Sequence, residues 1–143
     1  MALRTRNIVS IMAASLAFVV SAAPRAEAQD LRAHIPFEFR VNVTTLPAGF
    51  YDITQLTGTP AVQLRSPEGG VMVMMDRSTP PRNQENPQLT FTKYGDRYFL
   101  RDIRISGERE LHIKQSVAER EMERASKDGK GPAATLVAVA VSK

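Results

Sequence analysis

Residues 31–41 alternate strictly between apolar side chains and residues that are not typical of a core. The apolar positions are Leu31, Ala33, Ile35, Phe37, Phe39 and Val41. A β-strand places successive side chains on opposite faces, so one face of this stretch forms a continuous apolar surface. That surface is stable only when other elements cover it. Pro36 interrupts the stretch and has no N–H to donate to a sheet, so we expect an edge strand or a bulge there.

The rest of the chain predicts short strands separated by tight turns, without the strand–helix–strand rhythm of a parallel sheet. Expected strands are residues 50–56, 61–65, 71–75, 89–94, 97–105, a short segment around Leu111 and Ile113, and residues 133–142. Residues 42–49 are expected to form a turn, and residues 76–87, with three prolines, the longest loop. We therefore predict an all-β, mainly antiparallel fold of about eight short strands, arranged as a sandwich or a partly open barrel.

One helix is expected before the last strand. Residues 116–119 (SVAE) match a capping box, in which Ser116 accepts from an amide three residues on and Glu119 reaches back. Glu119 is also assigned to the solvated side of the helix, and Gly129 suits the position just after its end. The last strand carries small residues, Ala138 and Ala140, on one face, so we expect the helix to lie over that face.

The first 28 residues have the pattern of a secretory signal peptide. Arg4 and Arg6 precede an apolar stretch at residues 8–23, and residues 26–28 (AEA) form a small-x-small cleavage site before Gln29. The apolar stretch is shorter than the roughly 20 residues that a membrane span needs. We therefore expect an exported protein, periplasmic or extracellular, with no stable membrane span after cleavage.

Residues 29–143 then form one domain by length, and the chain has no cysteine with which to make disulfides. The formal charge of +4 includes three arginines and one glutamate of the signal segment, so removing that segment leaves +2. The remaining basic residues are dispersed among acidic ones rather than clustered. This distribution gives no indication of a nucleic-acid partner.

Three stretches resemble an uncharacterised group of small exported β-rich proteins common in Acidobacteria: residues 35–39 (IPFEF), 46–51 (LPAGFY) and 94–100 (YGDRYFL). Residues 89–91 and 116–121 look like further landmarks of the same group. The resemblance implies export and a β-rich domain and carries over no catalytic residue. Residues 42–45 (NVTT) depart from it, because a glycine-containing loop is more usual before the LPAG turn.

No motif of nucleophilic catalysis, cofactor binding or metal binding stands out, so we predict no catalytic, cofactor or metal residues. The chain has no Gly-x-Ser-x-Gly motif, and its carboxylates, among them Glu38, Asp52, Asp76 and Asp102, are interpreted as exposed strand or turn residues. A metal site would require His34 and His112 to lie on paired strands, together with a third ligand such as Glu38 or Glu110.

The most unusual cluster is Met72, Met74 and Met75. Methionine is flexible and suits an adaptable apolar pocket, so Met72 and Met74, with Phe91 and Phe99, are the candidate lining of a ligand cavity. Ordinary core packing is the alternative interpretation of the same residues.

Three functions follow as hypotheses. The leading one is a non-enzymatic exported β-domain that binds an unknown partner or serves as an envelope or extracellular structural component, with residues 76–87 and the neighbouring strand ends as its contact surface. The second is a carrier of a small apolar ligand in the Met-lined cavity. The third is a hydrolase that uses scattered carboxylates.

Overall fold

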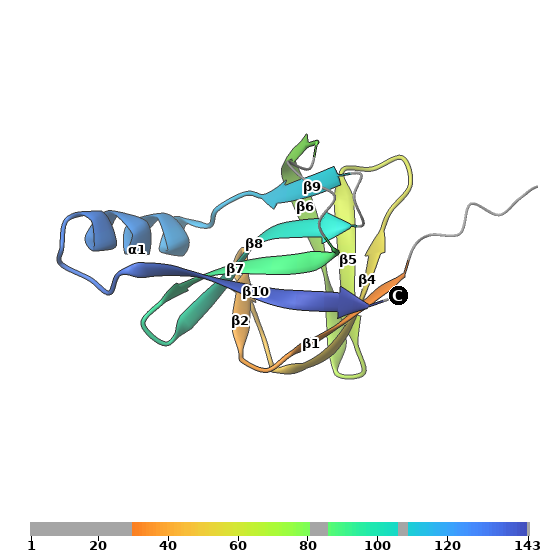
Figure 1. Cartoon of the computed structure of the whole chain (residues 1–143), viewed down its shortest axis with the longest axis horizontal. Coiled ribbons are helices and arrows are strands. Elements are labelled where there is room, and N and C mark those ends of the chain that lie inside the picture. The colour runs from red at the N-terminus through yellow and green to blue at the C-terminus, as the bar shows by residue number, and fades with distance from the viewer. Residues whose placement is uncertain (1–29, 81–85, 106–108, 143) are drawn as a thin grey trace, which may run out of the picture.

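A computed structural model describes residues 30–80, 86–105 and 109–142, which form a mainly antiparallel β-barrel with one helix (Figure 1). The expected signal peptide and the central part of the expected loop at residues 76–87 lie outside the described residues, and residues 76–79 of that loop instead continue the preceding strand. The strands are β1 Leu31–Ile35, β2 Phe39–Val41, β3 Thr44–Leu46, β4 Gly49–Gln55, β5 Ala61–Ser66, β6 Gly69–Thr79, β7 Gln88–Tyr94, β8 Arg97–Ile105, β9 Arg109–Ile113 and β10 Ala134–Ser142. The helix, α1, spans Val117–Lys127.

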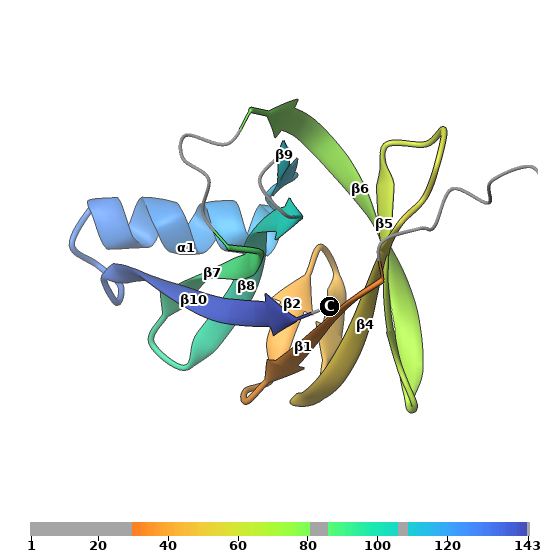
Figure 2. The same ribbon diagram turned by 45° about the vertical axis from the view of Figure 1, so that its right-hand side comes forward.

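Eight of these strands close into a barrel, in the order β8-β7-β10-β1-β4-β5-β6-β9, because β9 pairs with β8 as well as with β6. Figure 2 shows the meander of β4, β5 and β6 on one side, with β7, β8 and β10 on the other. The predicted antiparallel all-β class is confirmed, and of the two expected architectures the barrel is present, in closed form. The β2–β3 hairpin is an addition that joins the barrel through a parallel pairing of Arg40 with Phe99.

The first predicted strand is two strands. β1 ends at Ile35, and the chain turns at residues 36–38 before β2 begins at Phe39, which agrees with the lack of an N–H on Pro36. The apolar alternation nevertheless continues through the break, and the side chains of Leu31, Ile35 and Val41 are buried. The expected turn at residues 42–49 is corrected in part, since it contains the short strand β3.

The barrel interior is filled by aliphatic and aromatic side chains. Phe39 packs edge-on against Tyr51 and Phe91, with ring centroids 5.3 and 5.4 Å apart. Phe37 stacks on Tyr98 at 3.8 Å. Tyr51 in addition donates a hydrogen bond from its hydroxyl to the carbonyl oxygen of Pro47 (2.6 Å), which fixes the predicted turn before β4. These contacts tie β2 to β4 and β7 across the core.

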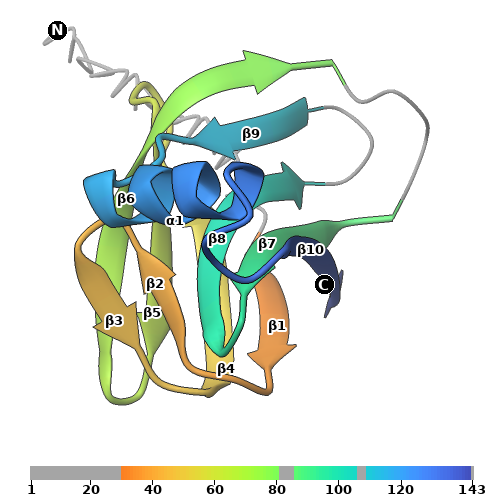
Figure 3. The same ribbon diagram turned by 90° about the vertical axis from the view of Figure 1, so that its left-hand side faces the viewer.

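Helix α1 begins and ends where the sequence predicts. The hydroxyl of Ser116 accepts a hydrogen bond from the amide of Glu119 (3.1 Å), and Gly129 has a φ of 67°, the left-handed conformation that suits a helix C-terminus. Its position was predicted wrongly, because Ala138 and Ala140 are exposed and are therefore not covered by α1. Figure 3 shows α1 beside β9 and across the outer side of β8.

Candidate functional site

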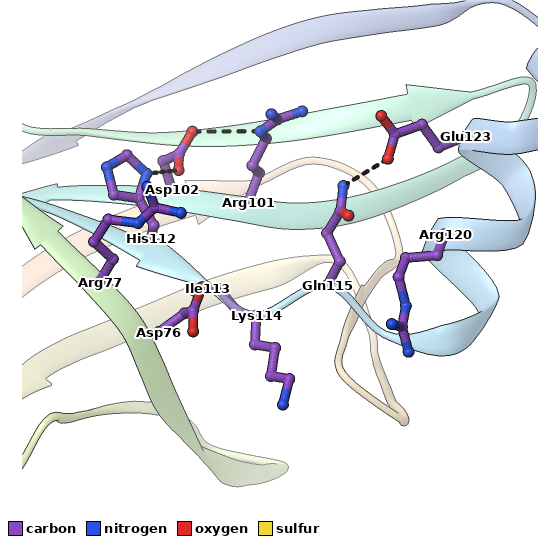
Figure 4. Close-up of a pocket in the computed structure, with 10 residues that line it drawn as sticks. All are labelled: Asp76, Arg77, Arg101, Asp102, His112, Ile113, Lys114, Gln115, Arg120 and Glu123. Carbon is purple, nitrogen blue, oxygen red and sulfur yellow. Dashed lines mark hydrogen bonds and ion pairs between the residues drawn. The ribbon is translucent and has the colours of Figure 1, made fainter. Parts of the chain in front are cut away.

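A polar groove of about 520 Å³ lies on the outer side of the barrel, between β6, β8, β9 and α1 (Figure 4). β6 and β8 each contribute two adjacent residues, the end of β9 and the segment after it contribute four, and α1 contributes two. The lining residues are Asp76, Arg77, Arg101, Asp102, His112, Ile113, Lys114, Gln115, Arg120 and Glu123.

His112 stands at the centre of a hydrogen-bonded chain at this groove. Its Nδ1 lies 2.6 Å from Oδ1 of Asp102, and its Nε2 lies 2.8 Å from Oγ1 of Thr79. An ionised carboxylate only accepts hydrogen bonds, so Nδ1 carries the hydrogen towards Asp102. Neutral His112 then accepts at Nε2 from the Thr79 hydroxyl. These two hydrogen bonds therefore fix the orientations of the three side chains relative to one another.

A β-bulge in β6 places Thr79 within hydrogen-bonding distance of His112. Met75 pairs with Ile113, but the next pair is Arg77 with His112, so Asp76 is an extra residue. Met75 faces the core, and regular alternation would turn Arg77 and Thr79 towards the core as well. The bulge reverses the alternation, so that both side chains share the outer face with His112.

A second bulge, in β8, places Asp102. Phe91 pairs with Leu100 and Thr90 pairs with Asp102, so Arg101 is the extra residue. Leu100 is buried in the core, and an uninterrupted strand would direct Asp102 inward too. Instead Asp102 lies directly across from His112 on the outer face. Both extra residues, Asp76 and Arg101, line the groove themselves.

Cationic side chains exceed anionic ones in the groove. Of its three carboxylates, Asp102 is held by His112, and Glu123 accepts hydrogen bonds from Lys127 (2.6 Å) and Gln115 (3.1 Å). The third, Asp76, forms no ion pair with another described residue. The hydrogen bonds of Lys127 and then Gln115 hold the pKa of Glu123 below its usual value. The remaining cations of the groove lack such partners: among the described residues, no ion pair is formed by Arg77, Lys114 or Arg120. Their charges are available to a ligand.

Helix α1, which lines one side of the groove, carries a buried carboxyl group. Glu119 is 4% exposed, and its Oε1 has no hydrogen-bond partner in the described part of the chain. Burial raises the pKa of Glu119 to about 7; the positive charge of Arg101 opposes this effect, and the negative charges of Glu123 and Asp102 add to it. The assignment of Glu119 to the solvated side of the helix is therefore wrong, and the return bond of the predicted capping box is not made.

The four residues expected to line a ligand cavity are not brought together. Phe91 and Phe99 are buried, but Met72 and Met74 are more than half exposed. The reason is alternation along β6, in which Val73 points into the core and its two neighbours point outward.

The two histidines also lie apart, because His34 is in β1, which pairs with β4 and β10, whereas His112 is in β9. His34 instead packs against the ring of Phe50, with centroids 4.6 Å apart. No group of three or more potential metal ligands forms within residues 30–80, 86–105 and 109–142. The polar groove was not predicted as a site, although two of its residues, Asp76 and Arg77, begin the stretch named as a contact surface.

The chain matches no family model, no curated protein and no solved structure. Across the described residues, no helix combines the length and apolar character needed to cross a bilayer. The groove is therefore the feature of the molecule from which a function can be inferred.

Proposed function

We propose that the protein is an exported binding domain that holds an anionic ligand in the polar groove. The observation that carries the proposal is the set of cations without ion-pair partners, Arg77, Lys114 and Arg120, which line one groove from β6, from the segment after β9 and from α1. Arginine presents several N–H donors in a planar fork that matches carboxylate and phosphate oxygens. A small molecule with two or more negative charges fits this arrangement best.

Two carboxylates of the groove are engaged by neighbouring groups of the protein. The Asp102 carboxylate contacts His112 at 2.6 Å, with Nε of Arg101 3.9 Å from its other oxygen. Glu123 accepts hydrogen bonds from Lys127 and Gln115 on the helix side. These contacts partly offset the two negative charges, which would otherwise oppose an anionic ligand more strongly.

Calorimetric titration with citrate and with inorganic phosphate tests the proposal. We expect heat of binding that weakens as ionic strength rises. The double variant Arg77→Gln/Arg120→Gln should weaken citrate binding about 100-fold or more, because two charge-assisted hydrogen bonds are lost and each is worth roughly 1.5–3 kcal/mol.

Arg65→Gln is the matched control, since Arg65 is an exposed arginine on β5 outside the groove. It should bind citrate like the unmodified protein. If citrate and phosphate give no heat of binding at low salt, or if Arg65→Gln and the groove double variant weaken binding equally, the groove is not the anion site.

We also propose that the domain acts after export, on the basis of the signal-like pattern of residues 1–28. Expression of the full chain in a bacterium and intact mass measurement of the periplasmic and culture fractions test this. A species beginning at Gln29 is expected in one of these fractions, whereas a full-length species confined to the cytoplasm would contradict export.

A further inference from the structure

We propose that Thr79, His112 and Asp102 form a hydroxyl–imidazole–carboxylate centre that hydrolyses carboxylic esters of anionic acids bound in the groove. The inference rests on the proposed anion site and adds a reaction to it. Its basis is the pair of hydrogen bonds at His112, 2.8 Å from Nε2 to Oγ1 of Thr79 and 2.6 Å from Nδ1 to Oδ1 of Asp102. A nucleophile within reach of a base that a third group orients is the arrangement of serine hydrolases, and it is recognised by geometry rather than by order in the chain.

The two bulges support this inference independently of the distances. His112 faces outward by the regular alternation of β9, but Thr79 and Asp102 reach the same face only because Asp76 and Arg101 are extra residues in their strands. Bulges are frequent next to active sites, where they redirect a side chain. Here two separate bulges bring the side chains of Thr79 and Asp102 to the imidazole of His112.

The environment suits a reacting centre that is partly shielded from water. The side chains of His112 and Asp102 are 32% and 15% exposed, and both line the groove, so the imidazole is accessible from one side. Thr79 lies two residues beyond Arg77 on the same face of β6, which places its hydroxyl next to the groove. Arg77 pairs across the strands with His112 and lines the same groove, so in this proposal it is the candidate cation for the negative charge that develops on the carbonyl oxygen.

The reaction has a complete balance with water as the second reactant. Oγ1 of Thr79 attacks the ester carbonyl carbon, and its proton passes to Nε2 of His112, while Asp102 stabilises the imidazolium that forms. The bond from the carbonyl carbon to the alkoxide breaks, and the alkoxide leaves as an alcohol with that proton. Water then attacks the acyl-threonine and gives a proton to Nε2, which returns it to Thr79. The products are the free acid and the alcohol.

The test compares two chromogenic esters, p-nitrophenyl hemisuccinate and neutral p-nitrophenyl acetate, on the purified full chain. The hemisuccinate carries a carboxylate that the groove cations can hold, so we expect a higher kcat/KM for it than for the acetate. Thr79→Val and His112→Gln should each lower kcat/KM for the hemisuccinate by about 10²-fold or more, the usual worth of general acid–base catalysis. Thr79→Ser should retain activity, and peptide mapping after rapid quenching should find the succinyl group on residue 79.

Asp102→Asn tests the positioning role of Asp102, because an amide does not favour the imidazolium as a carboxylate does. We expect a lower rate and a changed pH profile of kcat/KM, which a purely structural role would not produce. Thr45→Val, at an exposed threonine on β3, is the control for loss of a hydroxyl elsewhere. Equal rates in Thr79→Val and the unmodified chain, or succinyl groups found on lysines alone, would overturn the catalytic inference.

Citrate titration of the same preparations separates the two proposals. If citrate binds in the groove but Thr79→Val hydrolyses the ester at the unmodified rate, the catalytic inference fails and the binding proposal stands. If citrate does not bind, the binding proposal fails whatever the ester assay gives.

Discussion

The barrel interior and the polar groove are built by opposite faces of the same strands. On β6, β8 and β9, the inner face carries Val73, Ile103 and Leu111, which are at most 1% exposed. The outer face of these strands carries Arg77, Asp102 and His112, which line the groove. One face contributes close packing and the removal of apolar surface from water, and the other contributes charge and hydrogen bonds.

The packed core and the charged, hydrogen-bonded side chains therefore lie on opposite sides of the same sheet. Among the described residues, the interior is packed with aromatic and aliphatic side chains that contact one another. The groove lies where two strands depart from regular pairing, at Asp76 and Arg101. Changes inside should therefore affect stability, and changes in the groove should affect binding.

The largest expected effect is at Phe91, which is fully buried and contacts the rings of Phe37 and Phe39. Phe91→Ala should lower the free energy of unfolding by about 3–5 kcal/mol, because it removes buried apolar surface and leaves a cavity. Urea unfolding followed by circular dichroism measures the loss.

Phe50→Ala is the matched control, since the same side chain on β4 is 58% exposed. It should cost less than about 1 kcal/mol. If the two variants lose equal stability, the contrast between interior and outer surface is wrong.

An intermediate effect is expected at Glu119, a buried residue of α1, the helix that lines one side of the groove. Its pKa in the folded state is raised from 4.5 to about 7 by burial, so the folded protein holds a proton that the unfolded chain releases. The stability gained from this proton is complete below pH 4.5 and is lost as pH rises to about 7. Above that pH the domain carries a buried charge near Glu123 and Asp102 that Arg101 only partly offsets.

Glu119→Gln removes the titration and should flatten this part of the stability profile. At pH 8 the variant should be more stable than the unmodified protein by about 1–3 kcal/mol in denaturant unfolding. Glu121→Gln, at an exposed glutamate on the same helix, should leave the profile unchanged. A profile that Glu119→Gln does not alter would show that Glu119 is not buried as a titrating group.

Much of the barrel could be predicted from the sequence because its information is local. The alternation at residues 31–41 identified the inward side chains, and the cap at Ser116 and the glycine at residue 129 set the ends of α1. Strand order could not be predicted in this way, because closure of the barrel depends on the pairing of β6 with β9 and of β1 with β10, which join residues far apart in the sequence. The helix was placed wrongly for the same reason. The small residues on one face of β10 suggested a close neighbour, but a local pattern does not show which element packs there.

The groove could not be predicted from the sequence for a specific physical reason. A period of two assigns Thr79 and Asp102 to the faces of Met75 and Leu100, and a bulge reverses the assignment without a local composition signal. Asp76 and Arg101 look like ordinary polar residues of a loop and a strand. A polar residue at a predicted core position, such as Asp102 after Leu100, is the one available clue to such a bulge.

The smallest expected effect is at Ala140, and it tests which face of β10 is covered. Ala140 is exposed, so Ala140→Leu should change the free energy of unfolding by no more than about 0.5 kcal/mol. Ala33 in β1 is 1% exposed and faces the core, so Ala33→Leu should cost about 1–3 kcal/mol through overpacking. Urea unfolding of the two variants compares the same added volume on opposite faces of neighbouring strands. A loss at Ala140 as large as at Ala33 would mean that the outer face of β10 is covered, which would restore the helix position that the sequence predicted.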